Sequence, residues 1–316
     1  MAKAADEAGL TIEQVAGQFG LSEGPHWDHV NQKLYFVDIF GQKLYKLDPA
    51  TGSISSTYVE NGPVGVAVPV EGMRDKFVAG SGTDFVLITW DGESNVTKSA
   101  AQVLAKVDQN RNNTRWNDGK VDSTGRFWGG TMGPEDNGNV ELNQATLYSI
   151  SCDLKPQVEV TPVSISNGLA WSPDDTTFYY IDSPTRQVVS YDFNAASGDI
   201  SNKKTVFDLA KNNVTGLPDG MTIDTDGNLW VALYMGHSVI QVNPKTGELL
   251  RTVKMPADRV TSVAFGGVNF DILYVTTSSV GLNEEELKQQ PLAGYVFAVK
   301  GLGVRGLPAN SFKLNA

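Results

Sequence analysis

The hydrophobic and polar positions of residues 217–233 describe one complete structural unit. Asp219 and Gly220 open it, and residues that alternate between apolar and polar follow them. The dipeptide Asp226-Gly227 is typical of a tight turn, after which residues 229–233 return as an apolar segment. This pattern predicts two antiparallel strands joined by a hairpin turn.

The same unit recurs along the chain. Such a repeat indicates the overall architecture more directly than any single strand or turn. Copies begin near residues 23, 64, 118, 167, 219 and 261, at a spacing of roughly 40 to 55 residues that is typical of propeller blades. Each copy has room for three or four short strands, and no helical period interrupts them. We therefore predict an all-β fold, a six-bladed β-propeller in which residues 1–316 form a single domain.

The two ends of the chain are expected to meet in the last blade. Residues 11–16 precede the first copy as a strand-like segment, and residues 294–299 end the sixth copy. If the N-terminal segment adds a strand to the last blade, the ring closes and its sheet edges are covered. We expect residues 1–9 to form a flexible tail outside the ring.

Composition narrows the class of partner. A formal net charge of -11 over 316 residues disfavours nucleic acid and anionic membrane surfaces, which leaves a small molecule as the expected partner. Cys152, the single cysteine, cannot form an internal disulfide, which favours a reducing compartment. The N-terminus lacks the apolar core of a signal peptide, and no apolar run could span a bilayer. We therefore expect a cytoplasmic protein, and no feature points to an obligate protein partner.

The first strand of each propeller blade lines the central channel, so residues at one position of the repeat converge there. The residues before the repeated glycine are Glu23, Val64, Asp118, Asn167 and Asp219, with Thr261 or Ser262 near this position in the sixth copy. Carboxylates and an amide oxygen suit a hard divalent ion such as calcium or magnesium, and could also accept manganese or zinc. The alternative is that these polar residues only cap turns.

Two other catalytic patterns lack the context that they require. Residues 20–24 fit the nucleophile elbow of a serine hydrolase, but that elbow needs a strand that runs into a helix, and a strand follows here. His26 and His29 are three residues apart, which in a strand does not place both on one face to bind zinc.

Five segments of the chain, residues 22–27, 115–120, 166–172, 218–221 and 261–267, carry a family resemblance. They resemble the regucalcin, gluconolactonase and luciferin-regenerating enzyme family, in order and with its spacing, from about residue 21 to residue 303. The resemblance implies a six-bladed propeller with one divalent metal ion in its central channel. It also implies lactone hydrolysis as the chemistry.

The resemblance assigns roles to individual residues. Glu23, Asn167 and Asp219 match the metal ligands of the family, and Asp219 also matches its general base. Arg115 and Asn117 match a pair that contacts the substrate, and Glu135 matches a further carboxylate on the substrate side.

Two further residues are candidates for the channel: Asp118, which precedes a repeated glycine, and Trp116, which lies within the substrate-contacting segment. Trp116 lies between Arg115 and Asn117, and it either contacts the substrate or packs on a neighbouring blade. Pro134 and the insertion at residues 137–142 depart from the family pattern, and the insertion could reshape the mouth of the channel. These departures affect the identity of the substrate more than the type of reaction.

The function that these observations favour is hydrolysis of sugar-type lactones by a metal-activated water that attacks the lactone carbonyl. Calcium is the leading candidate for the metal, with zinc, manganese and magnesium as alternatives. Two other functions fit the same residues. One is a luciferin-regenerating enzyme, or a hydrolase of esters or organophosphates, that uses the same site. The other is a calcium-binding regulatory protein with little turnover.

Overall fold

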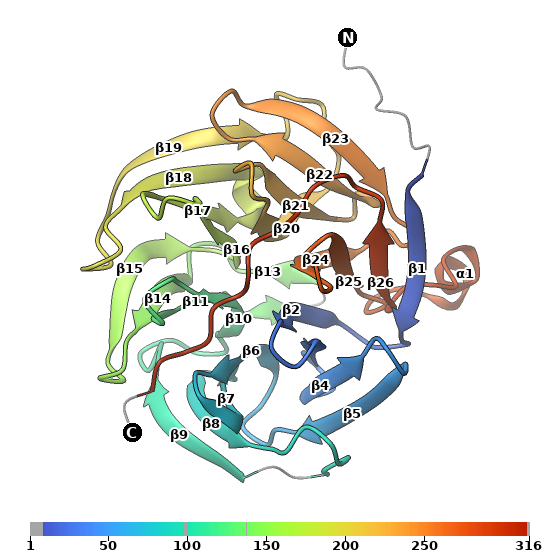
Figure 1. The fold of residues 1–316 in the computed structure, drawn as a ribbon. Helices are drawn as coiled ribbons and strands as arrows, with labels where there is room; N and C mark the ends of the chain where they lie inside the picture. The colour runs from blue at the N-terminus through green and yellow to red at the C-terminus, as the bar shows by residue number, and fades with distance from the viewer. Residues whose placement is uncertain (1–8, 98–99, 137, 315–316) are drawn as a thin grey trace.

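The computed structural model describes residues 9–97, 100–136 and 138–314. The tail expected at residues 1–9 therefore lies, except for Gly9, outside the described residues. Six four-stranded antiparallel sheets surround a central axis in the described chain, which confirms the predicted six-bladed propeller (Figure 1). The first strand of each sheet lies nearest the axis.

The blades are numbered in chain order, and their strands are given from the channel outward. Blade 1 comprises β2 (Ser22–Asp28), β3 (Lys33–Asp38), β4 (Lys43–Asp48) and β5 (Ser53–Tyr58); blade 2 comprises β6 (Val64–Val70), β7 (Met73–Ser81), β8 (Asp84–Thr89) and β9 (Ala100–Lys106). Blade 3 comprises β10 (Arg115–Val121), β11 (Phe127–Met132), β14 (Ala145–Ile150) and β15 (Pro156–Val163); blade 4 comprises β16 (Ser166–Trp171), β17 (Thr177–Asp182), β18 (Gln187–Phe193) and β19 (Ile200–Asp208).

Blade 5 comprises β20 (Leu217–Ile223), β21 (Leu229–Tyr234), β22 (Ser238–Asn243) and β23 (Glu248–Lys254). Blade 6 comprises β24 (Val260–Gly266), β25 (Ile272–Thr277), β26 (Val296–Lys300) and β1 (Thr11–Ala16). A small hairpin of β12 (Glu135–Asp136) and β13 (Asn139–Val140) extends from blade 3. The 3-10 turn η1 (Ser183–Thr185) follows β17.

The N-terminal strand closes the ring, as the sequence predicted. Strand β1 pairs with β26 in antiparallel orientation, with Thr11 opposite Lys300 and Gln14 opposite Phe297. The outer strand of blade 6 therefore comes from the opposite end of the chain to its other three strands (Figure 1). This arrangement joins the first and last parts of the chain in one sheet.

Apolar side chains fill the spaces between adjacent blades. One cluster joins blades 4 and 5 through residues such as Ile181, Met221 and Val231, which are almost completely buried. Because each blade shares its core with its neighbours, the position of the inner strands is fixed by packing from both sides. Those strands carry the candidate site.

One short helix was not predicted. Helix α1 (Glu284–Gln289) lies between β25 and β26, and none of its residues is buried. The Asn283 side chain accepts hydrogen bonds from the backbone N–H groups of Glu285 and Glu286, and the Glu286 carboxylate accepts one from the Asn283 N–H. This capping box stabilises the helix. The helix has no apolar face, so the sequence shows no amphipathic pattern that would predict it. No helix in the described chain is long and apolar enough to cross a membrane.

The inner strand of every blade contains a shift in pairing near the start of the repeat. The shifts fall between Glu23 and His26, Val64 and Val66, Trp116 and Gly119, Asn167 and Leu169, Pro218 and Met221, and Val260 and Ser262. A β-bulge bends a strand and changes the direction of its side chains. The six bulges therefore act together at one level of the channel.

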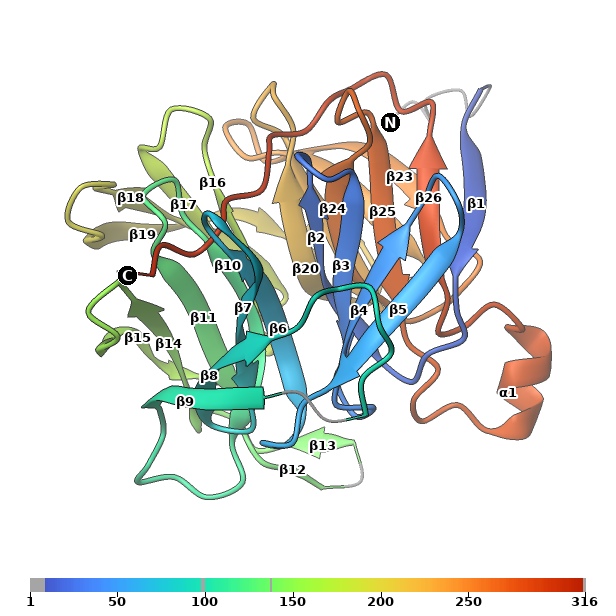
Figure 2. The same ribbon diagram turned by 60° about the horizontal axis from the view of Figure 1, so that its bottom comes forward.

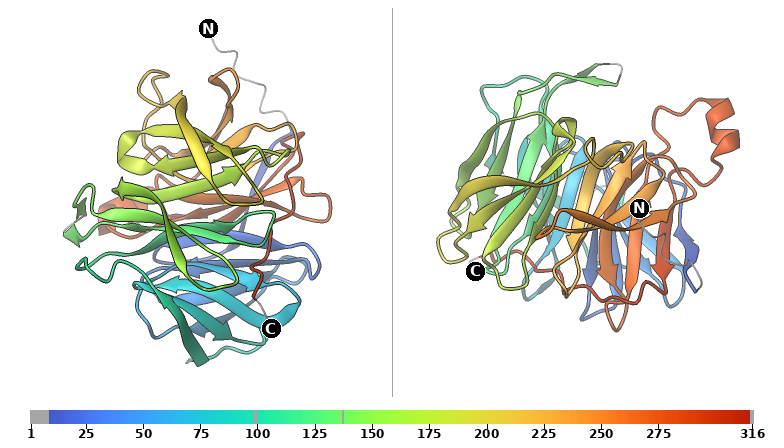
Figure 3. Two further views of the ribbon diagram at one scale, coloured as in Figure 1. Left: turned by 90° about the vertical axis from the view of Figure 1, so that its left-hand side faces the viewer. Right: turned by 90° about the horizontal axis from the view of Figure 1, so that it is seen from above.

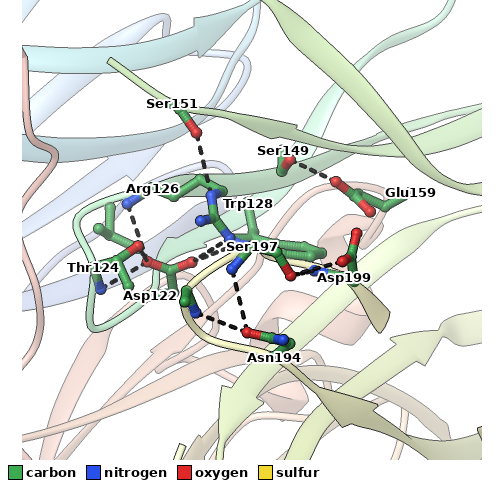
Figure 4. A network of polar contacts seen from close by, with 12 residues as sticks. Asp122, Thr124, Arg126, Trp128, Ser149, Ser151, Glu159, Asn194, Ser197 and Asp199 are labelled. Atoms are coloured by element: carbon green, nitrogen blue, oxygen red, sulfur yellow. Dashed lines mark hydrogen bonds and ion pairs between the residues drawn. The ribbon is translucent and has the colours of Figure 1, made fainter. Parts of the chain in front are cut away.

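Two blades fix the turn after the inner strand with the same aspartate–tryptophan contact. In blade 3, Asp122 accepts hydrogen bonds from the Thr124 N–H at 2.9 Å and from Trp128 Nε1 at 2.9 Å (Figure 4). In blade 5, Asp224 accepts from Trp230 Nε1 at 3.0 Å. Each buried carboxylate thus ties a turn to the blade core, which is a structural role.

The C-terminal segment, residues 301–314, crosses one face of the ring from blade 6 towards blades 2 and 3 (Figure 1, Figure 2). Its backbone forms hydrogen bonds with blades 5 and 2: Thr225 N–H donates to Arg305 O at 2.8 Å, and Phe312 N–H donates to Pro69 O at 2.9 Å. Phe312 is fully buried and packs against Phe85. The β12–β13 hairpin and α1 project from the opposite face (Figure 2, Figure 3). The two ends of the channel are therefore built differently.

Candidate active and metal site

Four polar residues occupy equivalent positions on the inner strands of four blades. Each lies at the same distance before the residue that opens the next turn: Glu23 before Asp28, Asn117 before Asp122, Asn167 before Ser172, and Asp219 before Asp224. In blades 2 and 6 the paired residues that precede the bulge are Val64 and Val260. Polar groups therefore converge on the channel from these four blades.

This equivalence corrects the sequence prediction for blade 3. Asn117, and not Asp118, shares the position of Glu23, Asn167 and Asp219. Asp118 instead occupies the position that is glycine in blades 1, 4 and 5. Choosing the residue before the repeated glycine selects the wrong residue in blade 3. There the glycine is Gly119, which comes one residue later, at the point where strand pairing resumes after the bulge.

A cavity of about 550 Å³ opens on the face that carries the β12–β13 hairpin, and we call it the mouth cavity. It is lined by Leu21, Glu23, Ile39, Phe40, Arg115, Asn117, Met132, Glu135, Gly138, Val140, Ile165, Asn167, Ser183, Leu217, Asp219, Tyr234, Met235, Arg259, Val280 and Gly281. Six of the eight candidate site residues are in this set. The structure therefore brings together the proposed ligands and the proposed substrate-contacting groups.

Asp118 lines a different cavity. This lower cavity, of about 300 Å³, lies at the end crossed by the C-terminal segment and also contains His26 and Lys120. Lys120 Nζ donates to Met221 O at 2.7 Å, and the Gly119 N–H donates to the Asp118 carboxylate at 2.7 Å. Burial raises the pKa of Asp118 to about 6, against the opposing effect of Lys120. Asp118 is thus a channel residue, but it lies outside the mouth cavity.

Trp116 is not a channel residue. Its side chain is fully buried and packs edge-on against Phe127 and Tyr148, with ring centroids 5.8 and 6.0 Å away. A Cβ atom on Gly80 would lie 2.5 Å from the Trp116 ring, so blade 2 leaves space for the indole. Of the two alternatives for Trp116, packing on a neighbouring blade is the one that the structure adopts.

Asn167 presents an unsatisfied acceptor to the site. Its Nδ2 donates to Ser183 Oγ at 2.8 Å, whereas its buried Oδ1 has no hydrogen-bond donor. Ser183 Oγ in turn donates to Pro218 O at 2.7 Å, which fixes the hydroxyl between blades 4 and 5. A buried carbonyl oxygen without a donor is energetically unfavourable unless a ligand completes it.

Two carboxylates, Glu23 and Asp219, are also buried in this part of the site. Burial raises the pKa of Glu23 well above its ordinary value, and repulsion from Asp219 and Asp118 raises it further. Burial and the Asp118 charge likewise raise the pKa of Asp219, against hydrogen bonds from Gly220 and Asn167. A cation among these oxygens would reverse both effects.

The donor set fits a hard divalent ion. It consists of two carboxylates and one amide oxygen, all buried, with open cavity beside them. No group of three or more His, Cys, Asp and Glu side chains in the described chain could hold a metal ion, so a metal bound here would need a further donor such as the Asn167 amide. Oxygen donors of this kind suit calcium or magnesium better than zinc.

Arg115 is held in place by Asn117 and Phe40. Its Nη1 donates to Asn117 Oδ1 and to Trp116 O, both at 3.0 Å, and its Cζ lies 5.6 Å from the centre of the Phe40 ring. Asn117 Nδ2 donates to Ser166 O at 2.9 Å. Burial lowers the pKa of Arg115 to about 10, against the charges of Glu135, Glu23 and Asp219. Both the oxygen and the nitrogen of the Asn117 amide thus have protein partners, so the role of Asn117 is to position Arg115.

Glu135 approaches the cavity from the hairpin of blade 3. It pairs with Val140 across β12 and β13, and Gly138 and Val140 also line the mouth cavity. The insertion at residues 137–142 was expected to reshape the mouth, and its described residues do form part of that wall; residue 137 lies outside them.

Sequence reasoning missed several residues of the mouth cavity, among them Phe40, Ser183, Tyr234 and Arg259. The first three share a position, because each lies at or just after the end of the second strand of its blade. In a propeller the second strand of each blade ends on the face where the inner strand begins. Residues at the ends of the second strands therefore surround the channel mouth. That signal can be found in the sequence once the blades are assigned.

Comparisons with known proteins identify the family of this chain. Residues 21–279 match the family described as SMP-30/Gluconolactonase/LRE-like region. The chain belongs to this family. Among its SMP-30/gluconolactonase relatives, regucalcin of Xenopus laevis is 40% identical over 306 residues, which cover 96% of this chain and 98% of that protein. Regucalcin of Bos taurus is 42% identical over 287 residues, which cover 90% and 92% of the two chains.

Solved structures of the family have the same architecture. A luciferin-regenerating enzyme superposes with a TM-score of 0.90 at 38% identity, covering 97% of this chain and all of that one. A protein described as the calcium-binding protein regucalcin, from Agrobacterium tumefaciens, superposes with a TM-score of 0.85 at 21% identity, covering 95% and 97%. At that lower identity the similarity establishes the fold alone.

Proposed function

We propose that the protein is a divalent-metal-dependent hydrolase of sugar-type lactones. The observation that carries this proposal is the buried Asn167 Oδ1, which has no donor and lies with Glu23 and Asp219 at the floor of a cavity that also contains Arg115. Membership of a family whose description includes gluconolactonase supports the reaction class. The substrate that we propose is a small molecule, and no protein partner is needed.

The proposal assigns metal binding, proton transfer and substrate binding to named residues. Glu23, Asn167 and Asp219 would hold the metal ion, which when bound polarises a carbonyl oxygen and lowers the pKa of water. A carboxylate oxygen of Asp219 accepts a proton from the attacking water. The water oxygen bonds to the lactone carbonyl carbon, the ring ester C–O bond breaks, and the proton passes to the departing oxygen. Arg115, positioned by Asn117 and Phe40, donates hydrogen bonds to substrate oxygens.

Two alternatives use the same residues. The similarity to a luciferin-regenerating enzyme favours a hydrolase or recycling enzyme with another substrate, such as an ester or organophosphate. The similarity to regucalcins favours a calcium-binding protein with little turnover. Both retain the metal site. The first differs from the main proposal in its substrate, and the second differs in having little turnover.

The test is hydrolysis of D-glucono-δ-lactone, followed with a pH indicator. The protein is assayed after chelation and again after addition of calcium, zinc, manganese or magnesium. We expect chelation to abolish turnover and one of these ions, calcium first among them, to restore it. Metal binding without turnover of any lactone would instead favour the regulatory alternative.

A further inference from the structure

Two arginines face each other across the mouth cavity. Arg115 begins the inner strand of blade 3, and Arg259 directly precedes the inner strand of blade 6. Blades 3 and 6, from which they come, lie opposite each other in the ring of six (Figure 1). Both side chains line the cavity, yet their surroundings differ.

The charges near Arg115 and near Arg259 differ, although Asp219, Glu135 and Asp258 all act on Tyr234 beside Arg259. Glu135, Glu23 and Asp219 all act on the Arg115 charge. Arg259 makes no ion pair within the described chain, and its one hydrogen bond runs from Nη2 to Gly281 O at 3.3 Å. Its Nε is buried without an acceptor. The neighbouring carboxylate, Asp258, contacts His237 Nε2 at 3.1 Å instead.

Tyr234 holds the Arg259 guanidinium against the cavity wall. The Arg259 Cζ lies 5.8 Å from the centre of the Tyr234 ring, and both residues line the mouth cavity. The Tyr234 hydroxyl has no hydrogen bond to any other part of the described chain. A guanidinium supported on a ring keeps its planar fork of donors fixed, and such a fork matches the oxygens of a carboxylate or phosphate.

From this arrangement we infer that Arg259 and Tyr234 form a subsite for an anionic group of the substrate. The inference rests on the proposed function and narrows its substrate class to lactones that carry a phosphate or a carboxylate away from the reacting ester. The lactone carbonyl lies at the floor, near Asp219 and Arg115, while the anionic group extends to the wall formed by blades 5 and 6. A neutral sugar lactone leaves the Arg259 charge without a counterion.

Three lactones test the subsite: D-glucono-δ-lactone, its 6-phosphate, and D-glucaro-1,4-lactone, which carries a carboxylate. We expect the wild-type kcat/KM to be about 10-fold higher for at least one of the anionic lactones than for the neutral one, as charge-assisted hydrogen bonds imply. Arg259→Gln should abolish this preference, and Arg259→Lys should retain part of it. The anionic lactone that responds identifies the group that binds.

Arg251 provides a matched control. Its Cζ lies 6.0 Å from the centre of the Trp230 ring and its Nη1 donates to Leu302 O at 2.7 Å, so it resembles Arg259 in its contacts, but it does not line the mouth cavity. Arg251→Gln should leave the preference for the anionic lactone intact. Equal kcat/KM for all three lactones in the wild type would overturn the inference, as would an equal loss on all three in Arg259→Gln.

A binding measurement separates this inference from the proposed function. If no lactone is hydrolysed, the proposed function fails, and the subsite is then tested with 6-phosphogluconate and gluconate in the presence of calcium. We expect 6-phosphogluconate to raise the Tm of the wild type and of Arg251→Gln more than gluconate does, and to lose this advantage in Arg259→Gln. Equal shifts for both compounds in the wild type would overturn the subsite.

Discussion

Ser183 orients the amide of Asn167 by accepting a hydrogen bond from Nδ2 at 2.8 Å, and Asn167 Oδ1 has no donor. Ser183 comes from the turn after β17, and its own hydroxyl is fixed by Pro218 O on blade 5. The direction of the proposed ligand is therefore set by a residue that is not itself a ligand.

Ser183→Ala should weaken calcium binding about 10-fold, because groups that orient a ligand typically contribute this much to metal affinity. Calorimetric titration of the chelated protein with calcium measures the effect. Ser190→Ala is the control, since Ser190 is also buried in blade 4 but does not line the mouth cavity. Unchanged calcium affinity in Ser183→Ala would show that Asn167 does not bind the ion through Oδ1.

Asp219→Asn should lower kcat by roughly 100-fold or more, the usual effect of removing a general base, because the amide cannot accept the proton of water. Calcium binding is measured on the same preparation, so that loss of the metal is separated from loss of the base. Asp118→Asn provides the comparison, since Asp118 is equally buried but lines the lower cavity, and its kcat should fall much less. Full turnover by Asp219→Asn, or by Asp219→Ala with metal bound, would exclude the base.

His26 should make the protein less stable in acid. Burial in the lower cavity lowers the pKa of this imidazole from 6.5 to about 4. The folded state therefore binds fewer protons than the unfolded state between these values, so stability decreases as the pH falls from 6.5 to 4. The loss amounts to about 3 kcal/mol. Tm measured against pH should fall less steeply in His26→Gln than in the wild type, whereas substitution of the exposed His29 should leave the slope unchanged. Parallel curves for His26→Gln and the wild type would contradict this role.

Deletion of residues 1–16 should unfold the protein at ordinary temperatures, because it removes β1 and exposes the full edge of β26. Deletion of residues 1–8 alone leaves that pairing intact and serves as the control. Circular dichroism and thermal unfolding of the two truncated proteins provide the measurement. A full Tm after removal of β1 would show that the ring does not depend on this closure.

The fold could be predicted because each blade carries the same local sequence pattern. Turn residues and alternating strands recur in each blade, and the need to cover sheet edges predicted the pairing of β1 with β26. Helix α1 escaped prediction because it buries no side chain and so has no amphipathic pattern. A capping box at Asn283 was its only signal.

The site residues could be predicted only in blades 1, 4 and 5, where the repeated glycine lies within the bulge. Choosing the residue before the glycine located Glu23, Asn167 and Asp219, but it selected Asp118 in place of Asn117 in blade 3, where the glycine comes one residue later. The packing of Trp116 depends on Gly80 in another blade, a contact between residues distant in sequence. Ser183 and Arg259 act through contacts with Asn167 and Tyr234, which lie on neighbouring strands or blades and are distant in sequence.

The pairing of Thr11 with Lys300 links folding to synthesis. A ribosome makes β1 first among the strands and β26 last, so the N-terminal strand must wait without its partner while nearly the whole chain is translated. Blades 1 to 5 can each form from consecutive segments as they emerge, but blade 6 cannot. A stalled or prematurely terminated chain therefore leaves a free strand at one end and an open sheet edge at the other, the two surfaces most prone to join with another copy.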